Sequence, residues 1–192
     1  MKLQNKLLEK WTTEELWLNL SAINGKDEDK MRRAIELCLE LYPIEGKKVA
    51  IESGTFHGVS ASLLAEYFDE VHTFEIKKGY VKDTTLHDKI WNYLGVQDKI
   101  HFHLINNDKE KEEILKGLEW NFGWVDGNHT TGTKRDFELL SKCGRILFHD
   151  YNSDKAKKQK GLWKAVYDYI NTLKKDIVHI DEPFVLWINK DK

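Results

Sequence analysis

Residues 49–60 read Val-Ala-Ile-Glu-Ser-Gly-Thr-Phe-His-Gly-Val-Ser. The stretch begins inside a short apolar run, which is typical of a buried β-strand, and it leads directly into a helical pattern over Gly58–Phe68. Gly54 and Gly58 permit a tight turn and a close approach of the backbone to a ligand, and a helix N-terminus offers free N–H groups. The stretch therefore predicts a strand, a turn that cradles a small molecule, and a helix.

Strand-like and helix-like segments alternate along most of the chain. Strands are predicted over Lys48–Glu52, Glu70–Ile76, Ile100–Ile105, Phe122–Asp126 and Arg145–Asp150, and helices over Gly58–Phe68, Tyr80–Leu94, Lys109–Leu118, Gly132–Leu140 and Gly161–Leu173. The strands are too apolar to face water on either side, so we expect an α/β, Rossmann-like doubly wound fold, with a mostly parallel sheet and helices on both faces. Asp176–Ile180 and Phe184–Asn189 predict an antiparallel C-terminal pair at the sheet edge.

The length of 192 residues predicts one compact domain with a single core. A helical pattern over Thr13–Tyr42 precedes the first strand. We therefore expect residues 1–46 to form a helical lead-in, which could serve as a lid, and residues 47–192 to form the Rossmann-like unit.

The charge balance narrows the choice of partners. Thirty Lys and Arg against 32 Asp and Glu leave a formal charge of −2, which argues against nucleic acid or an anionic membrane as the main partner. The opening residues contain no continuous apolar run, so we expect neither a signal peptide nor a membrane span, and a cytoplasmic protein. Two cysteines 105 positions apart exclude a Cys-rich zinc site. The C-terminal edge strands could pair between subunits of a homo-oligomer.

Glu75 closes the second predicted strand, 21 positions after Gly54. An acidic residue at this place can accept hydrogen bonds from both ribose hydroxyls of a nucleoside. A dinucleotide-binding loop would need further glycines where this chain has Phe56 and Val59. The pattern therefore favours a nucleoside cofactor other than NAD, and an NAD-dependent oxidoreductase is the weaker alternative.

The motif over Val49–Ser60 resembles the first motif of class I S-adenosylmethionine-dependent methyltransferases, and the likeness extends to about Asn189. It implies that the glycine-containing turn holds the methionine part of S-adenosylmethionine, that the acid after the second strand holds the ribose, and that the loop after the third strand brackets the adenine. The implied cofactor-binding residues are Glu52, Gly54, Thr55, Phe56, Gly58, Ser60, Glu75, Asn107, Asp108 and Asp126. For Asn107 and Asp108, a solvated turn is a comparable interpretation.

The ends of the fourth and fifth predicted strands, Gly123–His129 and Ile146–Tyr151, are similar to those of small O-methyltransferases of the catechol and macrocin types. In the metal-dependent members, carboxylates at these two positions hold a divalent ion, usually magnesium, against the hydroxyl oxygen of the substrate. The resemblance therefore implies that Asp126 and Asp150 are metal ligands. A hard cation lowers the pKa of a hydroxyl group, which makes its oxygen a better nucleophile.

The sequence departs from the metal-dependent pattern at Tyr151, which stands where a third ligand is expected. His129 and His149 could complete the site with the two aspartates, and two imidazoles would favour a transition metal over magnesium. Alternatively no metal binds, and His129 or His149, beside Asp126, takes the proton of the substrate. A third interpretation is that the histidines only form hydrogen bonds within the loops.

Three further features lie outside this pattern. His101 and His103 alternate along one strand and share a face, a geometry that metals use, but no carboxylate partner is evident, so a structural role is favoured. Lys155, Lys157, Lys158 and Lys160 predict a basic loop near the mouth of the site, which could attract an acidic substrate. Trp11 could belong to a lid.

The sequence as a whole favours an enzyme that transfers a methyl group from S-adenosylmethionine to a small-molecule acceptor, with oxygen as the expected acceptor atom. The main alternative is a methyltransferase-like domain that binds the cofactor without turnover and acts through a partner. Both share the same predicted cofactor cradle.

Overall fold

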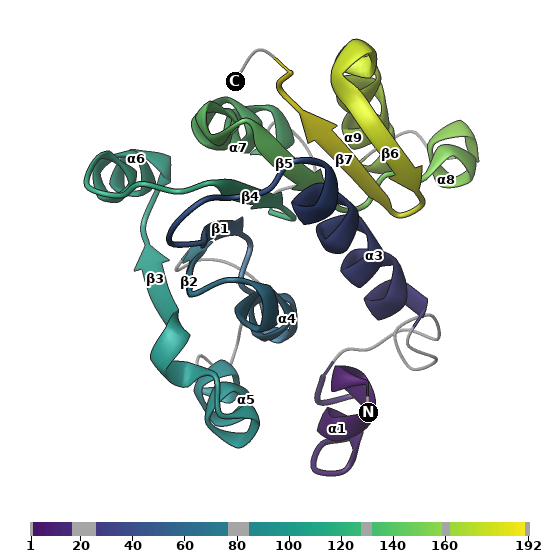
Figure 1. The fold of residues 1–192 in the computed structure, drawn as a ribbon. Helices are drawn as coiled ribbons and strands as arrows, with labels where there is room; N and C mark the ends of the chain where they lie inside the picture. Colours follow the sequence, from purple (N-terminus) through teal and green to yellow (C-terminus); the bar gives the residue numbers. More distant parts are fainter. Residues whose placement is uncertain (1, 17–25, 77–84, 128–131, 159–161, 191–192) are drawn as a thin grey trace.

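The strands form one sheet in a computed structural model that describes residues 2–16, 26–76, 85–127, 132–158 and 162–190 (Figure 1). Within these residues the strand order is β3-β2-β1-β4-β5-β7-β6. The strands are β1 Val49–Ser53, β2 Glu70–Ile76, β3 Ile100–Ile105, β4 Phe122–Val125, β5 Arg145–Phe148, β6 Ile177–Asp181 and β7 Phe184–Ile188. The first five are parallel, whereas β7 runs antiparallel to both β5 and β6. The predicted fold class is confirmed.

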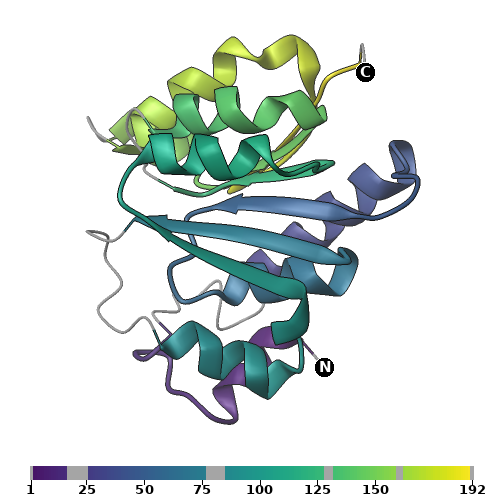
Figure 2. The same cartoon turned by 90° about the vertical axis from the view of Figure 1, so that its left-hand side faces the viewer.

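Helices cover both faces of the sheet (Figure 2). Their bounds are α1 Leu3–Leu8, α3 Lys26–Leu41, α4 Val59–Tyr67, α5 Leu86–Leu94, α6 Asp108–Lys116, α7 Gly132–Leu140, α8 Ser153–Lys158 and α9 Leu162–Thr172. Helices α1, α3, α4 and α5 contribute to one apolar cluster, and α6, α7 and α9 contribute to a second cluster on the opposite face. Successive strand residues alternate between the two clusters because strand side chains point to opposite faces. No helix among the described residues is long and apolar enough to cross a membrane.

The sequence predicted β4 and β5 to run further than they do. Their predicted ends, Asp126 and Asp150, lie beyond the observed ends at Val125 and Phe148. Asp150 has a φ of 63°, in the left-handed region, so it cannot continue an extended strand. The side chains with predicted chemistry therefore lie on the loops just past the strands.

Other predicted segments also differ from the structure. Residues 153–158 of the predicted basic loop form helix α8, because the Asn152 side chain accepts a hydrogen bond of 2.7 Å from the backbone N–H of Lys155 and so caps the helix. The helix predicted over Tyr80–Leu94 is seen as α5, while residues 80–84 of that prediction, like Lys160, lie outside the described residues. Within the expected helical lead-in, the pattern over Thr13–Tyr42 is seen as α3, with residues 13–16 in a turn, and no helix was predicted over the residues of α1.

The N-terminal segment packs on the same core as the sheet. Leu3 and Leu7 of α1 are buried in the cluster that includes α3, and the Trp11 ring meets Tyr93 of α5 edge-on at 5.4 Å between centroids. The division at residue 46 and the lid role of Trp11 stay predictions.

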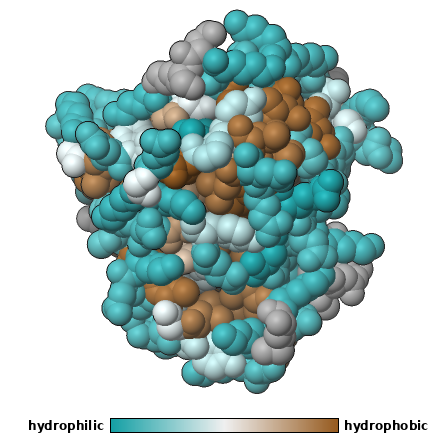
Figure 3. Space-filling model, viewed as in Figure 1, coloured by the Kyte–Doolittle hydropathy of each residue, from teal (hydrophilic) through white to brown (hydrophobic). Residues whose placement is uncertain are grey.

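The surface seen in Figure 3 is mostly hydrophilic, with apolar side chains in the region of β6 and β7 and a second group lower in the view, in the region of α1 and α5. Ile180, on the edge strand β6, is 49% exposed. Pairing of this edge between copies of the chain also stays a prediction.

Candidate functional site

The strand order reverses between β1 and β4, and the carboxyl ends of these strands meet at Gly54. The backbone N–H of Asp126 donates to the carbonyl oxygen of Ser53 at 3.0 Å. Gly54 has a φ of 96°, and a Cβ atom there would lie 2.6 Å from the carbonyl oxygen of Asp126. Ligands of open α/β sheets bind at such a reversal point, beyond the carboxyl ends of the strands.

Gly58 is also required by packing. Its φ is 74°, and a Cβ atom there would lie 2.7 Å from the indole of Trp91, a buried side chain of α5. The Nε1–H of Trp91 donates to the Gly58 carbonyl oxygen at 2.9 Å. The two predicted cofactor glycines thus have structural reasons for being glycine, so replacing either one would disturb the fold together with any ligand site.

Glu75 faces the turn that leaves β1. Its Oε2 accepts a hydrogen bond of 2.8 Å from the backbone N–H of Phe56, and its Oε1 accepts one of 3.0 Å from Ile76. Phe56 has a φ of 47°, an uncommon conformation for an aromatic residue. The structure therefore joins Glu75, the penultimate residue of β2, to the glycine-containing turn.

Glu52 lies fully buried beneath the same turn. It accepts hydrogen bonds from the Ser60 hydroxyl and, at 2.5 Å, from the Thr73 hydroxyl, whose oxygen is 2.6 Å from that of Thr55. Burial raises the pKa of Glu52 to about 8; the two hydroxyl hydrogen bonds oppose this effect, while the charges of Asp126 and Glu75 add to it. The sequence patterns did not single out Thr73.

Because its pKa is raised, Glu52 should make the protein less stable as the pH rises. An ion-paired carboxylate, whose pKa is lowered, has the opposite effect. The native state holds the Glu52 proton at a pH where the unfolded chain, with a pKa near 4.5, has lost it. The free energy of unfolding contributed by Glu52 is therefore fully present below pH 4.5 and is lost as the pH rises through about 8. We expect the stability of Glu52→Gln, relative to the unmodified chain in urea unfolding, to increase across this window. A difference that does not change with pH would contradict the assignment.

Asp126, His149 and Asp150 form a cluster beyond β4 and β5. The Nδ1 of His149 is 2.9 Å from the Oδ1 of Asp126 and 3.4 Å from the Oδ1 of Asp150. One ligand atom of each of the three residues lies within 4.8 Å of the others. Two carboxylates and an imidazole at this spacing are suited to holding a proton or a divalent cation.

The negative charges of Asp126 and Asp150 favour a positive charge on His149. Burial by itself lowers the pKa of His149, but the charge of Asp126 and the hydrogen bond to it, with the charges of Asp150 and Asp27, outweigh burial and raise the pKa to about 9. The two carboxylates therefore favour the protonated form of His149. The Asp150 backbone, held in the left-handed region, is the kind of local strain that occurs at functional sites.

Tyr151 takes no part in this cluster. It is buried, its ring stacks on Tyr167 at 5.0 Å, and its hydroxyl reaches Asn171 at 3.5 Å. The third donor beside the two aspartates is thus His149, which precedes Asp150, and the residue that follows Asp150 points elsewhere. His129, the other predicted base, lies outside the described residues.

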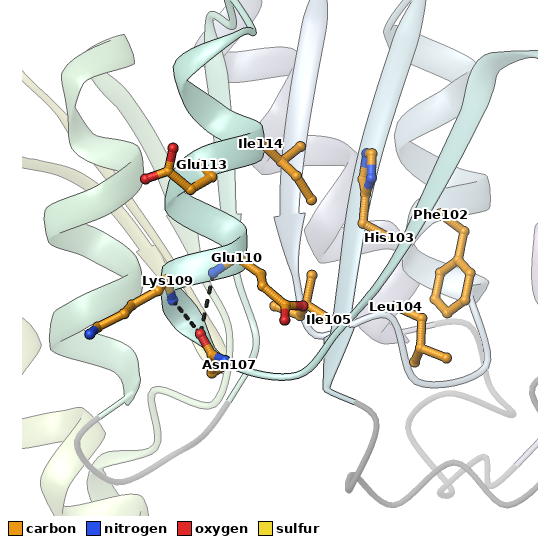
Figure 4. Close-up of a pocket in the computed structure, with 9 residues that line it drawn as sticks. All are labelled: Phe102, His103, Leu104, Ile105, Asn107, Lys109, Glu110, Glu113 and Ile114. Atoms are coloured by element: carbon orange, nitrogen blue, oxygen red, sulfur yellow. Dashed lines mark hydrogen bonds between the residues drawn. The ribbon is translucent and has the colours of Figure 1, made fainter.

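Asn107 and Asp108 have partners of their own. The Asn107 side chain caps α6 by accepting hydrogen bonds from Lys109 at 2.9 Å and Glu110 at 3.3 Å, and Asp108 pairs with Arg135 of α7 at 2.9 Å. Asn107 also borders a cavity of about 640 Å³ between β3 and α6 (Figure 4). None of the other predicted cofactor residues lines that cavity, although Glu75 is the register partner of Leu104, which does.

A buried polar network lies beneath the point where the strand order reverses. The sequence patterns did not predict it. Lys111 of α6 donates to Asp136 of α7 at 2.5 Å and to the Ser53 hydroxyl at 2.9 Å, and that hydroxyl donates to Asp136 at 2.6 Å. Lys111 and Asp136 are 3% and 4% exposed, which marks both as core residues. The available signal was helical spacing, because Lys111 precedes Leu115 by four residues and Asp136 precedes Leu140 by four.

No protein-family model and no curated protein matches the sequence of this chain. Solved structures do match its fold. The O-methyltransferase from Bacillus cereus, in complex with SAH, aligns over 98% of this chain and 90% of its own, with 12% identity and a TM-score of 0.64. TomG from Streptomyces achromogenes, an O-methyltransferase involved in tomaymycin synthesis and solved with SAM, aligns over 92% and 86%, with 15% identity and a TM-score of 0.64.

A third structure, the calicheamicin methyltransferase CalS11, aligns over 98% of this chain and 90% of its own, with 13% identity and a TM-score of 0.61. The chain therefore has the Rossmann-like fold of these methyltransferases, with a mostly parallel sheet that ends in an antiparallel C-terminal pair.

Proposed function

We propose that this protein transfers a methyl group from S-adenosylmethionine to a hydroxyl oxygen of a small molecule. One observation carries the proposal: Glu75 faces the turn at Phe56, on the same edge of the sheet where Asp126 and His149 lie together. A site for an adenosyl cofactor and a site for a polar acceptor are thus neighbours. The SAM and SAH complexes among proteins of the same fold support the choice of cofactor.

We propose that the cofactor contacts the cradle formed by the turn from Gly54 to Gly58 together with Glu52 and Glu75. Glu75 accepts hydrogen bonds from the ribose hydroxyls, since a carboxylate has lone pairs beyond the two that Phe56 and Ile76 use. The turn from Gly54 to Gly58, supported by Glu52, Thr55 and Ser60, holds the methionine part. The side chains of Asn107 and Asp108 are engaged with α6 and α7, so we do not assign them to the adenine.

The acceptor side of the site is built to hold an oxygen nucleophile. The donor set of Asp126, His149 and Asp150 fits a divalent cation, since its three atoms converge and its field already attracts a proton. Such an ion would lower the pKa of an acceptor hydroxyl. Asp126 accepts the hydrogen bond of His149 and so orients the imidazole, and Asp150, 10% exposed at its side chain, lies 3.4 Å from the same ring nitrogen. Alignment of the two reactants contributes most of the rate, because the sulfonium is already reactive.

Ligand-induced stabilisation tests the cofactor. S-adenosylhomocysteine at about 100 times its Kd should raise the Tm by about 5–10 °C, and NAD at the same concentration should leave it unchanged. Stabilisation by NAD without stabilisation by S-adenosylhomocysteine would reverse the proposal in favour of an oxidoreductase. Cofactor binding without methyl transfer to any of a panel of phenols and sugars would favour a binding domain.

Glu75→Ala should weaken the binding of S-adenosylhomocysteine by about 1–3 kcal/mol, because the ribose hydroxyls lose a charged acceptor. Isothermal titration calorimetry measures this change. Glu138→Ala is the matched control, since Glu138 is an exposed acid of α7 that pairs with Lys134 on the same helix. Equal affinity of the Glu75 and Glu138 variants would show that Glu75 only closes the turn.

Removal of divalent ions should abolish methyl transfer, and Mg²⁺ or Mn²⁺ should restore it. Asp126→Asn and Asp150→Asn should each lower the affinity for Mn²⁺, measured by titration, because each removes a charged oxygen ligand. Full activity after chelation, with unchanged activity in Asp150→Asn, would favour His149 as the base instead.

A further inference from the structure

Four polar side chains share one face of β2 and β3 near the amino ends of these strands: Glu70, His72, His101 and His103. His72 is the direct register partner of His101 across the parallel pair. From the sequence, the two histidines of β3 lacked a carboxylate partner. The sheet supplies both Glu70 and a third histidine from the neighbouring strand, because residues 70 and 72 point to the same face of β2.

The ligand atoms of three of these residues converge. The Oε1 of Glu70 is 2.7 Å from the Nε2 of His72 and 3.4 Å from the Nε2 of His101, and all three atoms lie within 4.8 Å of one another. The rings of His72 and His101 stack, with centroids 4.7 Å apart and an angle of 19° between their planes. The other oxygen of Glu70 pairs with Lys47, whose side chain is 64% exposed. Oε1 is therefore directed at the two imidazoles.

His103 holds His72 in place from behind. Its Nε2 lies 2.9 Å from the Nδ1 of His72, and its ring stacks on Phe74 at 4.6 Å. Because the Nδ1 of His72 is engaged in this way, its Nε2 is the atom that faces Glu70. An outer partner that fixes the orientation of a ligating imidazole is a regular feature of protein metal sites. His103 also lines the cavity beside α6, as Figure 4 shows.

We propose that Glu70, His72 and His101 bind a late transition metal ion of the Zn²⁺ type, with one coordination position left for water. Ligand atoms at 2.0–2.1 Å from a tetrahedral zinc ion lie about 3.3 Å apart. The 3.4 Å separation matches this value, and the 2.7 Å separation has to open by about 0.6 Å. The exposed imidazole of His101 also has to turn out of its stack on His72, because the lone pair of each Nε2 lies in the plane of its ring. Two imidazoles and one carboxylate select such an ion over magnesium, which prefers oxygen ligands.

This site is distinct from the methyl-transfer site. Glu70 begins β2 and Glu75 lies five residues further along the same strand, a separation of about 16 Å at the usual strand rise. An ion there would join the edge strand β3 to β2 at the end of the sheet opposite to the cofactor cradle. Its expected effect is on the stability of the β2–β3 pair, with methyl transfer unchanged.

Metal titration of the full chain, free of any histidine tag and stripped of metal with a chelator, tests the site. Zn²⁺ should bind in calorimetry, Co²⁺ should develop the visible absorption of a low-symmetry site, and Zn²⁺ should raise the Tm. His101→Ala and Glu70→Gln should each lower the Zn²⁺ affinity by roughly 10–100-fold or more. That range is seen when a residue that only hydrogen-bonds to a metal ligand is lost, and loss of a ligand itself should have at least the same effect. The side chain of His101 is 49% exposed, so its removal should leave the fold intact.

Two control variants show whether a loss of Zn²⁺ binding is specific to the proposed site. His179→Ala removes a histidine of β6, at the other edge of the sheet, and should bind Zn²⁺ as tightly as the unmodified chain. Asp126→Asn should keep the Zn²⁺ ion that Glu70, His72 and His101 hold, with the affinity of the unmodified chain, and lose only Zn²⁺ bound by the separate cluster of Asp126, His149 and Asp150. The proposal is overturned if Zn²⁺ does not bind, if His101→Ala and Glu70→Gln bind it normally, or if only Asp126→Asn loses it. In each case the histidines would form a hydrogen-bonded chain and nothing more.

Discussion

Lys111→Met is expected to lower the free energy of unfolding by about 3–5 kcal/mol, because it leaves a buried carboxylate without its cation. Asp136 is 4% exposed and would keep only the Ser53 hydroxyl as a partner among the hydrogen bonds of this network. The loss should propagate to the site, since the Ser53 carbonyl accepts the hydrogen bond of Asp126. Urea unfolding followed by circular dichroism measures the change.

The same helix provides the control for this variant. Lys116 of α6 pairs with Glu113 on the surface, where its side chain is 68% exposed, and Lys116→Met should leave the free energy of unfolding nearly unchanged. Adding Asp136→Leu to Lys111→Met should recover part of the loss, since an apolar pair removes the unpaired charge. Equal losses for Lys111→Met and Lys116→Met would show that the buried network contributes little.

Gly54→Ala is expected to destabilise the protein by about 2–5 kcal/mol, through two effects at one residue. Its φ of 96° is strained for any residue with a Cβ, and that atom would lie 2.6 Å from the Asp126 carbonyl oxygen, which is backbone and cannot rotate away. The ends of β1 and β4 would have to separate. We therefore expect a lower midpoint in urea and weaker binding of S-adenosylhomocysteine.

Gly95→Ala separates these two effects. Gly95 ends α5 with a φ of 69°, and nothing lies within 4 Å of a Cβ atom there. It should show only the cost of the left-handed backbone, about 1–2 kcal/mol. If Gly54→Ala were no less stable than Gly95→Ala, the close contact between β1 and β4 would not be the reason for glycine at position 54.

Much of the architecture was predictable because it depends on local patterns. The apolar runs that became β2 and β3 were predicted with their observed bounds, since turns and polar residues flank them on both sides. The placement of Glu75 and Asp126 at one edge followed from the parallel order, because the carboxyl ends of parallel strands lie together. The ends of β4 and β5 were less predictable, because they depend on the Asp150 backbone conformation.

The contacts between distant residues were not predictable. Glu28 of α3 accepts hydrogen bonds from the backbone of Leu3 and Gln4, and so caps a helix that shows no strong pattern of its own. Helical spacing placed Lys111 on an apolar face, but only the packing of α6 and α7 on the sheet brings it to Asp136. The antiparallel strand β7 lies between β5 and β6. This order depends on which strands pair across the sheet, so the pattern of the C-terminal segment alone does not predict it.

Periodicity and apolarity along the chain were thus enough for the strands and their covering helices, because each depends on neighbours a few residues apart. The cluster of Glu70, His72 and His101 and the buried ion pair of Lys111 and Asp136 depended on register between strands and on packing between layers. Those arise from interactions summed over the whole molecule, so no local stretch of residues contains them. Glu70 shows the difference most clearly: it is an ordinary acid in its own strand and becomes a ligand candidate only beside His101.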